Sequence, residues 1–293
     1  MSDSPRLAHN PWLMLLIGLI TGTMGGLLGI GGGVILIPLL VWIIRFDQRE
    51  AQGTSLALAV VVVIANLVNY YSQGIVYWDS AAIKLTLILA FAGMFATSAG
   101  SSWALRLPVR QLGRAFATVM LFAACWMIAS SVGHTSGPAQ APVRPPADFT
   151  LAKVLQFISV GVMGGFASGL AGIGGNVVMV PILTQLMHID QKFAQGYAVG
   201  GMLPIVAMGA VKYSRQKVGS LSTVIWLAPG SVAGVFLGGQ VLKRLSSPHL
   251  KLVFGIFLLL VASWQLITGG PKRAGTATPA TAPNSSDGAP DPA

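Results

Sequence analysis

The sequence is poor in charge and almost without cysteine. Only 9% of its 293 residues are charged and a single cysteine, Cys125, is present, whereas soluble domains carry about 25% charged residues. One thiol excludes an intrachain disulfide and a thiolate metal site. The eight acidic residues fall in connections or at the ends of apolar runs: Asp3, Asp47, Glu50, Asp79, Asp148, Asp190, Asp287 and Asp291. Cation pathways usually contain intramembrane carboxylates, so this distribution argues against a cation transporter.

Catalytic and cofactor motifs are missing as well. No H-E-x-x-H sequence is present, which excludes that class of zinc protease. The four histidines, His9, His134, His188 and His249, lie outside the apolar runs. Ser168 therefore has no intramembrane histidine to activate it as a nucleophile. The glycine-rich runs match neither a dinucleotide-binding loop nor a Walker A loop. We expect a protein that is not an enzyme, with no catalytic residue, no cofactor and no metal.

The sequence does contain long runs of apolar residues. Apolar residues make up 54% of the chain, in runs long enough to cross a membrane, which takes about 20 residues. The net charge of +10 comes without a basic cluster interleaved with aromatic residues, so we expect contact with membrane lipid and no nucleic-acid partner. These features predict an all-α integral membrane protein with several spans.

The chain consists of two homologous halves. Gly-Ile-Gly-Gly-Gly at 29–33, followed by Pro38, recurs as Gly-Ile-Gly-Gly-Asn at 172–176, followed by Pro181. The same offset of 143 pairs Asp47 with Asp190, Gln52 with Gln195 and Tyr70 with Tyr213. An offset of 138 then pairs Leu107, Leu112, Phe116, Leu121 and Trp126 with Leu245, Leu250, Phe254, Leu259 and Trp264. Duplicated apolar halves that each open with a glycine break are typical of secondary transporters.

The duplication divides the chain into five parts. They are a polar lead (1–11), the first transmembrane repeat (12–132), a Pro-rich linker (133–149), the second transmembrane repeat (150–268) and a tail (269–293) expected to be disordered. Each repeat holds four apolar segments: 12–44, 51–72, 81–105 and 110–132, then 152–187, 193–213, 222–243 and 248–267. The first segment is not expected to be a cleaved signal peptide, because it lacks an A-x-A-like site and belongs to the repeat.

The segment 12–44 is too long for one upright helix. As a continuous helix it would extend about 50 Å, against roughly 30 Å of hydrocarbon, so we expect a break at its glycines. If each long segment crosses once, the chain has eight spans. If each turns back at its break, six full crossings remain, the halves are inverted, and eleven of the 18 Lys and Arg fall on one side. The positive-inside rule favours this second topology, with both termini cytoplasmic.

The glycine breaks are the candidate substrate site. Irregular backbone inside a membrane lies within protein or lines a cavity. Helices expected to begin near Val34 and Val177 would point free N–H groups and positive dipole ends at the breaks. Two such ends near the midplane would bind an anion. The alternative is that these glycines only allow close helix packing. The matched position of the breaks in both halves favours the anion site.

Polar residues of the following helix add to this candidate site. Gln52, Ser55 and Asn66 share one helical face in the first half, and Gln195 stands at the Gln52 position in the second. Asn66 lies deep in the span, where its amide needs a partner or a cavity; helix–helix hydrogen bonding is an equal alternative. Thr54 and Ser55 act either as helix caps or as anion donors.

The order of these motifs resembles the sulfite exporter TauE/SafE family of bacterial inner-membrane permeases. The resemblance rests on Gly-Ile-Gly-Gly-Gly followed by Pro38, on Gly53-Thr54-Ser55 and on the second copy, and covers about residues 12–268. It implies transport of a small organosulfur or oxyanion substrate such as sulfite, sulfoacetate or another sulfonate. It implies a site formed by Gly31, Gly32, Gly33, Thr54, Ser55, Gly174, Gly175 and Asn176. The second half departs from the pattern at Asn176 and at Tyr197-Ala198, which replace glycine and Thr-Ser.

Together these features predict an anion permease of the cell inner membrane that works by alternating access. Its expected substrate site comprises Gly31, Gly32, Gly33, Gln52, Thr54, Ser55, Asn66, Gly174, Gly175, Asn176 and Gln195. An anion channel and a non-transporting scaffold or assembly factor are the alternatives from other classes. A proton as coupling ion and assembly as a homodimer stay open, as do the exact substrate and the direction. No buried carboxylate offers itself as a proton carrier, so the membrane potential alone could drive anion export.

Overall fold

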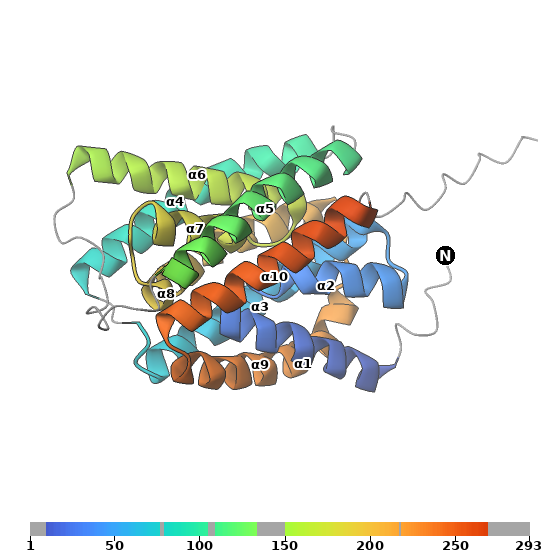
Figure 1. The fold of residues 1–293 in the computed structure, drawn as a ribbon. Coiled ribbons are helices and arrows are strands. Elements are labelled where there is room, and N and C mark those ends of the chain that lie inside the picture. Colours follow the sequence, from blue (N-terminus) through green and yellow to red (C-terminus); the bar gives the residue numbers. More distant parts are fainter. Residues whose placement is uncertain (1–9, 77–78, 105–108, 134–149, 217, 269–293) are drawn as a thin grey trace, which may run out of the picture.

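The computed structural model describes residues 10–76, 79–104, 109–133, 150–216 and 218–268, and the regular structure of this part is helical (Figure 1). The first half holds α1 (Pro11–Leu28), α2 (Gly33–Leu39) with its π-helical continuation η2 (Leu40–Ile44), α3 (Gln48–Ser72), α4 (Ser80–Ala104) and α5 (Val109–Gly133). The second half holds α6 (Leu151–Ala171), α7 (Asn176–Gln185), α8 (Gln191–Arg215), α9 (Leu221–Arg244) and α10 (Ser247–Thr268). The expected all-α fold with two broken-helix halves is confirmed. Most of the expected lead and linker, and all of the tail, lie outside the described residues.

Capping residues fix the ends of several helices. At the start of α1, Asn10 Oδ1 accepts hydrogen bonds from the N–H groups of Trp12 and Leu13, and Pro11 fills the first helical position. At the start of α8, Asp190 Oδ1 accepts a hydrogen bond from the N–H of the second helical residue. These local signals place the helix ends within a few residues of the apolar segments expected from the sequence.

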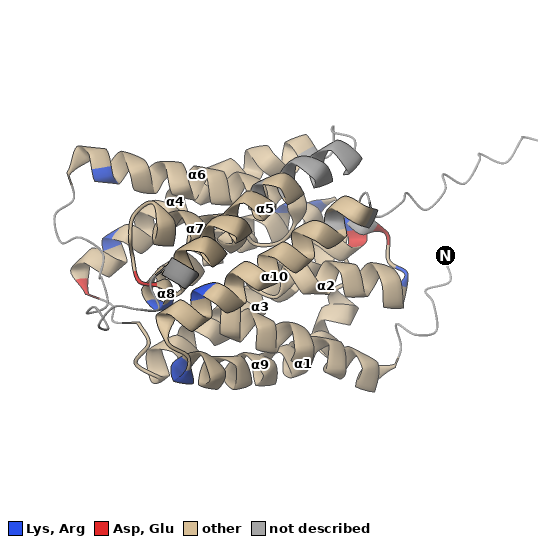
Figure 2. Ribbon diagram, in the orientation of Figure 1, with Lys and Arg blue, Asp and Glu red and all other residues tan. Residues whose placement is uncertain are grey.

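The outer faces of the bundle are apolar. Seven of the described helices are long and apolar enough to span a membrane. Large apolar side chains on the outer faces of the bundle are exposed, among them Trp12 (78%), Phe95 (70%), Phe122 (66%) and Ile225 (69%). The charged residues that Figure 2 colours gather toward the two ends of the bundle. This distribution is that of a multi-pass membrane protein, with lipid around the middle and water at the ends.

The tightest packing joins helices from different halves. Along α1, Gly18, Gly22 and Gly26 face the α9 backbone at Leu227, Ser231 and Val235. Along α6, Gly161, Gly165 and Gly169 face the α4 backbone at Leu89, Gly93 and Thr97. A β-carbon at any of the three α1 glycines would collide with the α9 backbone. Small residues at every fourth position allow such close approach in membranes, so these helix-internal glycines have a packing role.

The directions of the packed helices relate the two halves. Residue numbers rise together along α1 and α9, and along α6 and α4, so both pairs run parallel. The equivalent helices α3 and α8 run antiparallel instead. Their contacts pair Gln52 with Tyr213 and then Leu56 with Gly209, so numbers rise on α3 while they fall on α8.

In both halves the broken segment forms a hairpin. α3 begins beside the start of α9, where the Ser220 N–H donates to Thr54 Oγ1 over 2.9 Å. Because α1 runs parallel to α9 from that end, the chain from α1 through η2 leaves this end and returns to it (Figure 1). α6 and α7 do the same at the other end, where Ser247 Oγ donates to Asp190 Oδ1 over 2.9 Å. Each glycine break is the turn of such a hairpin.

We expect Gly22→Leu to destabilise the protein by about 3 kcal/mol or more, because its side chain would meet the α9 backbone, which cannot move aside. The measurements are the thermal unfolding midpoint in detergent and the monodisperse fraction after size-exclusion chromatography. Leu16→Val, on the exposed face of α1, is the matched control and should leave both values unchanged. A normal midpoint for Gly22→Leu would contradict the close α1–α9 packing.

Candidate functional site

The two glycine breaks meet in the middle of the bundle. Asn176 Nδ2, at the start of α7, donates a hydrogen bond to the carbonyl oxygen of Gly29 over 2.6 Å. A β-carbon placed on Gly33, at the start of α2, would lie 3.1 Å from Ile173 Cα. Segments that are 143 positions apart in the sequence are therefore in direct contact.

Positive φ angles make both turns. They occur at Gly29 (67°), Gly31 (69°) and Gly32 (74°), and at Gly172 (71°), Gly174 (91°) and Gly175 (76°). Residues with a side chain rarely adopt these angles, so both turns require glycine. Gly33 is not in this region, which explains how Asn176 can replace glycine at the equivalent position without backbone strain.

The helices α2 and α7 both begin at the breaks and run apart toward opposite ends of the bundle (Figure 1). Each starts within one residue of the position expected from the sequence, at Gly33 and at Asn176. The first N–H groups of a helix have no partner inside that helix and carry a partial positive charge. Two such partial charges therefore converge where the breaks meet.

Several polar side-chain atoms near the breaks are buried and have no hydrogen-bond partner among the described residues. They are Ser55 Oγ, Asn66 Oδ1, Ser168 Oγ, Asn176 Oδ1, Gln195 Nε2 and Gln195 Oε1, in residues that are 1% exposed or less. Ser168 lies at the second break, where its Cβ is 3.4 Å from the position of a β-carbon on Gly175. Ser55 Oγ would lie 2.8 Å from a β-carbon on Gly33. Each buried polar group without a partner costs about 1–3 kcal/mol of stability. Groups that bind a polar ligand are expected to be unpartnered in this way when the ligand is absent.

Gln52 lies at the second break and has a partner. Its side chain packs against Gly172 of the other half. Tyr213 Oη, from α8, donates a hydrogen bond to Gln52 Oε1 over 3.2 Å. The predicted site residue Gln52 is therefore beside a break, but its amide oxygen is already used inside the protein.

Gln195, the repeat equivalent of Gln52, is arranged differently. Its Cβ lies 3.3 Å from the position of a β-carbon on Gly29, so it packs against the first break. Tyr70, the equivalent of Tyr213, donates to the carbonyl oxygen of Gly26 over 2.8 Å. Gln195 is thereby left with both amide atoms unpartnered, and the first break carries the free amide.

Met202 was absent from the expected site, although it touches both breaks. Its ε-methyl contacts the positions that β-carbons would take on Gly31 and Gly174. The equivalent residue in the first half is Ala59, so the two halves differ in size at a matched position. This difference is the signal from which Met202 could have been found. A flexible thioether fills irregular space well, and here it fills the space between the breaks.

Two expected site residues have structural partners instead. Thr54 Oγ1 accepts a hydrogen bond from the Ser220 N–H at the start of α9, so the structure does not bring Thr54 to the breaks. Asn66 Nδ2 donates to the carbonyl oxygen of Gly25 over 3.3 Å, which is the helix–helix bond weighed as its alternative role. Only Asn66 Oδ1 stays unpartnered.

Gly32 and Gly175 shape the turns. A β-carbon on Gly32 would lie 3.0 Å from the carbonyl oxygen of Thr21, and one on Gly175 would collide with the carbonyl oxygen of Gly164. Each residue thus holds its turn against the preceding helix of its own half. A substitution at either position strains the backbone, so the unpartnered side chains of Ser55 and Gln195 are better probes of ligand binding.

The polar groups at the breaks are uncharged hydrogen-bond donors and acceptors. No charged side chain is among the contacts recorded for residues 29–33 and 172–176. The donors at the breaks are N–H groups at two helix starts, the hydroxyls of Ser55 and Ser168, and the free amide of Gln195. Such groups hold an anion by hydrogen bonds and helix dipoles without a fixed cation.

A helical bundle of two related halves, with an apolar outside and broken helices that meet at its centre, defines a membrane permease. The chain belongs to the sulfite exporter TauE/SafE family, which it matches over residues 2–127 and 157–289. These two matched regions correspond to the two halves. The family resemblance stated from the sequence is therefore confirmed, and the protein is a multi-pass membrane transporter.

Curated relatives agree with this class. The chain is 30% identical to a probable membrane transporter protein of Xylella fastidiosa, over 85% of this chain and 92% of the relative. It is 27% identical to a probable membrane transporter protein of Haemophilus influenzae, over 85% and 96%. It is 22% identical to the probable membrane transporter protein YunE of Bacillus subtilis, over 88% and 97%. These names state no substrate.

Asn176→Leu should lower the free energy of unfolding by about 1–3 kcal/mol, because the buried carbonyl of Gly29 loses this donor. Thermal unfolding in detergent measures the change. The control is Thr184→Val on the same helix, whose hydroxyl bonds only to carbonyls of its own helix and should matter little. Equal midpoints for the two variants would show that the bond between the breaks contributes nothing.

Proposed function

We propose that this permease carries a small sulfur oxyanion or sulfonate by alternating access around the two glycine breaks. One observation carries the proposal: the starts of α2 and α7 converge beside buried hydroxyl and amide groups that have no partner. The family name supplies the sulfur chemistry. Helix starts and neutral donors supply the preference for an anion.

The charge of the site favours a substrate with one negative charge. Each helix start is equivalent to roughly half a positive charge, so two starts balance about one unit. Hydrogen sulfite and sulfonates carry one negative charge, whereas sulfate carries two. Asn176 Oδ1 and Gln195 Oε1 are acceptors, and hydrogen sulfite can donate its proton to such an acceptor. We therefore propose selection of monoanions over sulfate.

We infer that the two halves are inverted repeats that exchange roles during transport. The antiparallel course of α3 and α8 supports this relation, as do the parallel pairs α1–α9 and α6–α4. In transporters of this kind, access alternates when one repeat rocks against the other around a fixed site. Met202, whose ε-methyl lies between Gly31 and Gly174, would have to move aside for the substrate, and its flexible side chain allows that.

The membrane potential is the proposed driving force. No carboxylate is among the recorded contacts of the breaks, so no proton carrier is built into them. A membrane potential that is negative inside drives an anion outward, by about 2.3 kcal/mol per unit charge at 100 mV. This term alone is sufficient for export against a moderate gradient.

Gln195→Leu should reduce transport while leaving stability unchanged or higher. Its amide has no partner among the residues that the structure describes, so leucine removes an unsatisfied buried group. A lost hydrogen bond to an anion is worth about 1.5–3 kcal/mol, which lowers affinity by about tenfold or more. Uptake of labelled sulfite into proteoliposomes, normalised to monodisperse protein, measures transport, and thermal unfolding measures stability.

Gln52→Leu is the matched control, because it makes the same change at the equivalent position. Here we expect lower stability, since Tyr213 Oη loses its acceptor. Normal sulfite affinity in Gln195→Leu would remove this residue from the site. Wild-type protein that neither takes up sulfite nor is stabilised by it would contradict the proposed function, and conduction far above carrier rates would favour a channel.

A further inference from the structure

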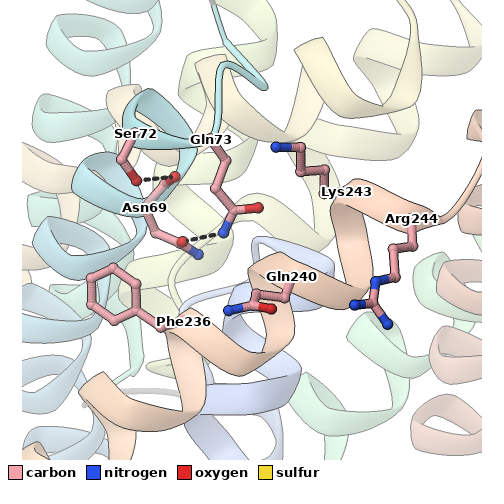
Figure 3. Close-up of a pocket in the computed structure, with 7 residues that line it drawn as sticks. All are labelled: Asn69, Ser72, Gln73, Phe236, Gln240, Lys243 and Arg244. Atoms are coloured by element: carbon pink, nitrogen blue, oxygen red, sulfur yellow. Dashed lines mark hydrogen bonds between the residues drawn. The ribbon is translucent and has the colours of Figure 1, made fainter.

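A polar cavity lies at one end of the bundle, apart from the breaks. It has a volume of about 410 Å³ and lies between the last turns of α3 and α9 (Figure 3). The residues that line it are Asn69, Ser72, Gln73, Phe236, Gln240, Lys243 and Arg244. Two of them are cationic, four are polar and uncharged, and none is acidic. In Figure 3 the amides of Gln73 and Gln240 and the ammonium of Lys243 extend into the space between the two helices.

A row of polar side chains on α3 leads from this cavity toward the breaks. From the cavity inward its members are Gln73, Asn69, Tyr70 and Asn66. Gln73 donates to Asn69 Oδ1, and Asn69 Nδ2 donates to an α9 carbonyl over 3.0 Å. Tyr70 and Asn66 donate to carbonyls in the last turn of α1, directly before the break at Gly29. Gln73 Oε1 is buried and unpartnered, so the row begins with an unsatisfied group at the cavity.

The equivalent position at the opposite end of the bundle is bridged by a lysine. Lys212 on α8 stands where α3 has Asn69. Its ammonium donates to Ser102 Oγ over 2.7 Å and to the carbonyl oxygen of Ser98, both on α4. A lysine of the protein thus bridges α8 and α4, whereas the equivalent pair α3 and α9 leaves a cavity with two cations.

We propose that this cavity is a vestibule that binds a small oxyanion on its way to or from the breaks. Lys243 and Arg244 attract the anion. Gln73 Oε1 is a buried acceptor without a partner among the described residues, and it can accept the proton of hydrogen sulfite. The vestibule rests on the proposed anion transport. Cations in the last turn of a helix also complement the helix dipole, but that role requires neither a cavity nor an unpartnered acceptor oxygen beside it.

The phosphate of an anionic lipid has the same chemistry as a free oxyanion and would meet the same groups. We commit to the free anion because the cavity opens onto the polar row of α3, which continues inward to the breaks. Charged clefts raise the capture rate of small ions by about 10- to 1,000-fold, and salt screens this effect. A lipid site would affect stability and not the concentration dependence of transport.

The test is the double variant Lys243→Gln/Arg244→Gln in proteoliposomes. We expect the half-saturating sulfite concentration to rise about tenfold, with the maximal rate preserved, because capture changes and turnover does not. Added salt should raise the wild-type value and have little effect on the variant. Each single variant should give an intermediate value. Lys153→Gln, in the first turn of α6 at the same end but outside the cavity, is the matched control and should behave as wild type.

A second arm separates free anion from lipid. Thermal stability is measured for wild type and double variant with added sulfite and, separately, with phosphatidylglycerol. A variant with reduced response to sulfite and an unchanged response to phosphatidylglycerol supports the vestibule. A variant that loses only the response to phosphatidylglycerol and keeps wild-type half-saturation overturns it, and identifies a lipid site. Both outcomes require wild-type protein to transport sulfite. A result against the vestibule can therefore be distinguished from a result against the proposed sulfite transport.

Discussion

The contact between the two glycine breaks is the constraint on which the rest of the structure depends. A break in a membrane helix frees N–H and C=O groups that lipid cannot satisfy. One of these groups is bonded across the halves: Asn176 Nδ2 donates to the carbonyl oxygen of Gly29. Other break residues bond within their own half, as the N–H of Leu36 does to Gly32 and that of Met179 to Gly175. Gln52 and Gln195 each pack on the first glycine of the opposite break. One broken hairpin therefore supplies part of the surroundings of the other.

Close helix packing holds these hairpins in place. α1 packs against α9, and α6 packs against α4. Each pair joins the two halves at a surface lined by glycine. Glycine thus has two distinct roles that the sequence presents as one pattern. At Gly22 a missing β-carbon lets two helices approach, whereas at Gly31 a positive φ angle turns the chain. The packing glycines lie inside the helix, and the positive-φ glycines lie at the break of the same segment.

Features that repeat in the sequence could be predicted, and features that depend on contacts between halves could not. The offset of 143 located both breaks, and apolar length located the helices, because both are local properties. Thr54 was expected at the site, since it precedes Ser55 in the motif. Neighbours on a helix point in different directions, however, and Thr54 meets the start of α9 instead. The free amide of Gln195 could not be predicted from the sequence either. It depends on a tertiary contact, because Tyr70 donates to the carbonyl oxygen of Gly26 and not to Gln195.

The framework is repeated, but the side chains that fill it are not. At matched positions of the two halves, Gly33 corresponds to Asn176, Ala59 to Met202, and Asn69 to Lys212. In the proposed alternating-access mechanism, two halves of identical sequence would give two access states of equal energy. Under that proposal these substitutions would make the states unequal, since Lys212 bridges its helices while Asn69 leaves room for a cavity. A ligand or a membrane potential would then shift the balance by its difference in free energy between the states. In this proposal, repetition of the backbone allows two states, and divergence of a few side chains sets which state the protein prefers.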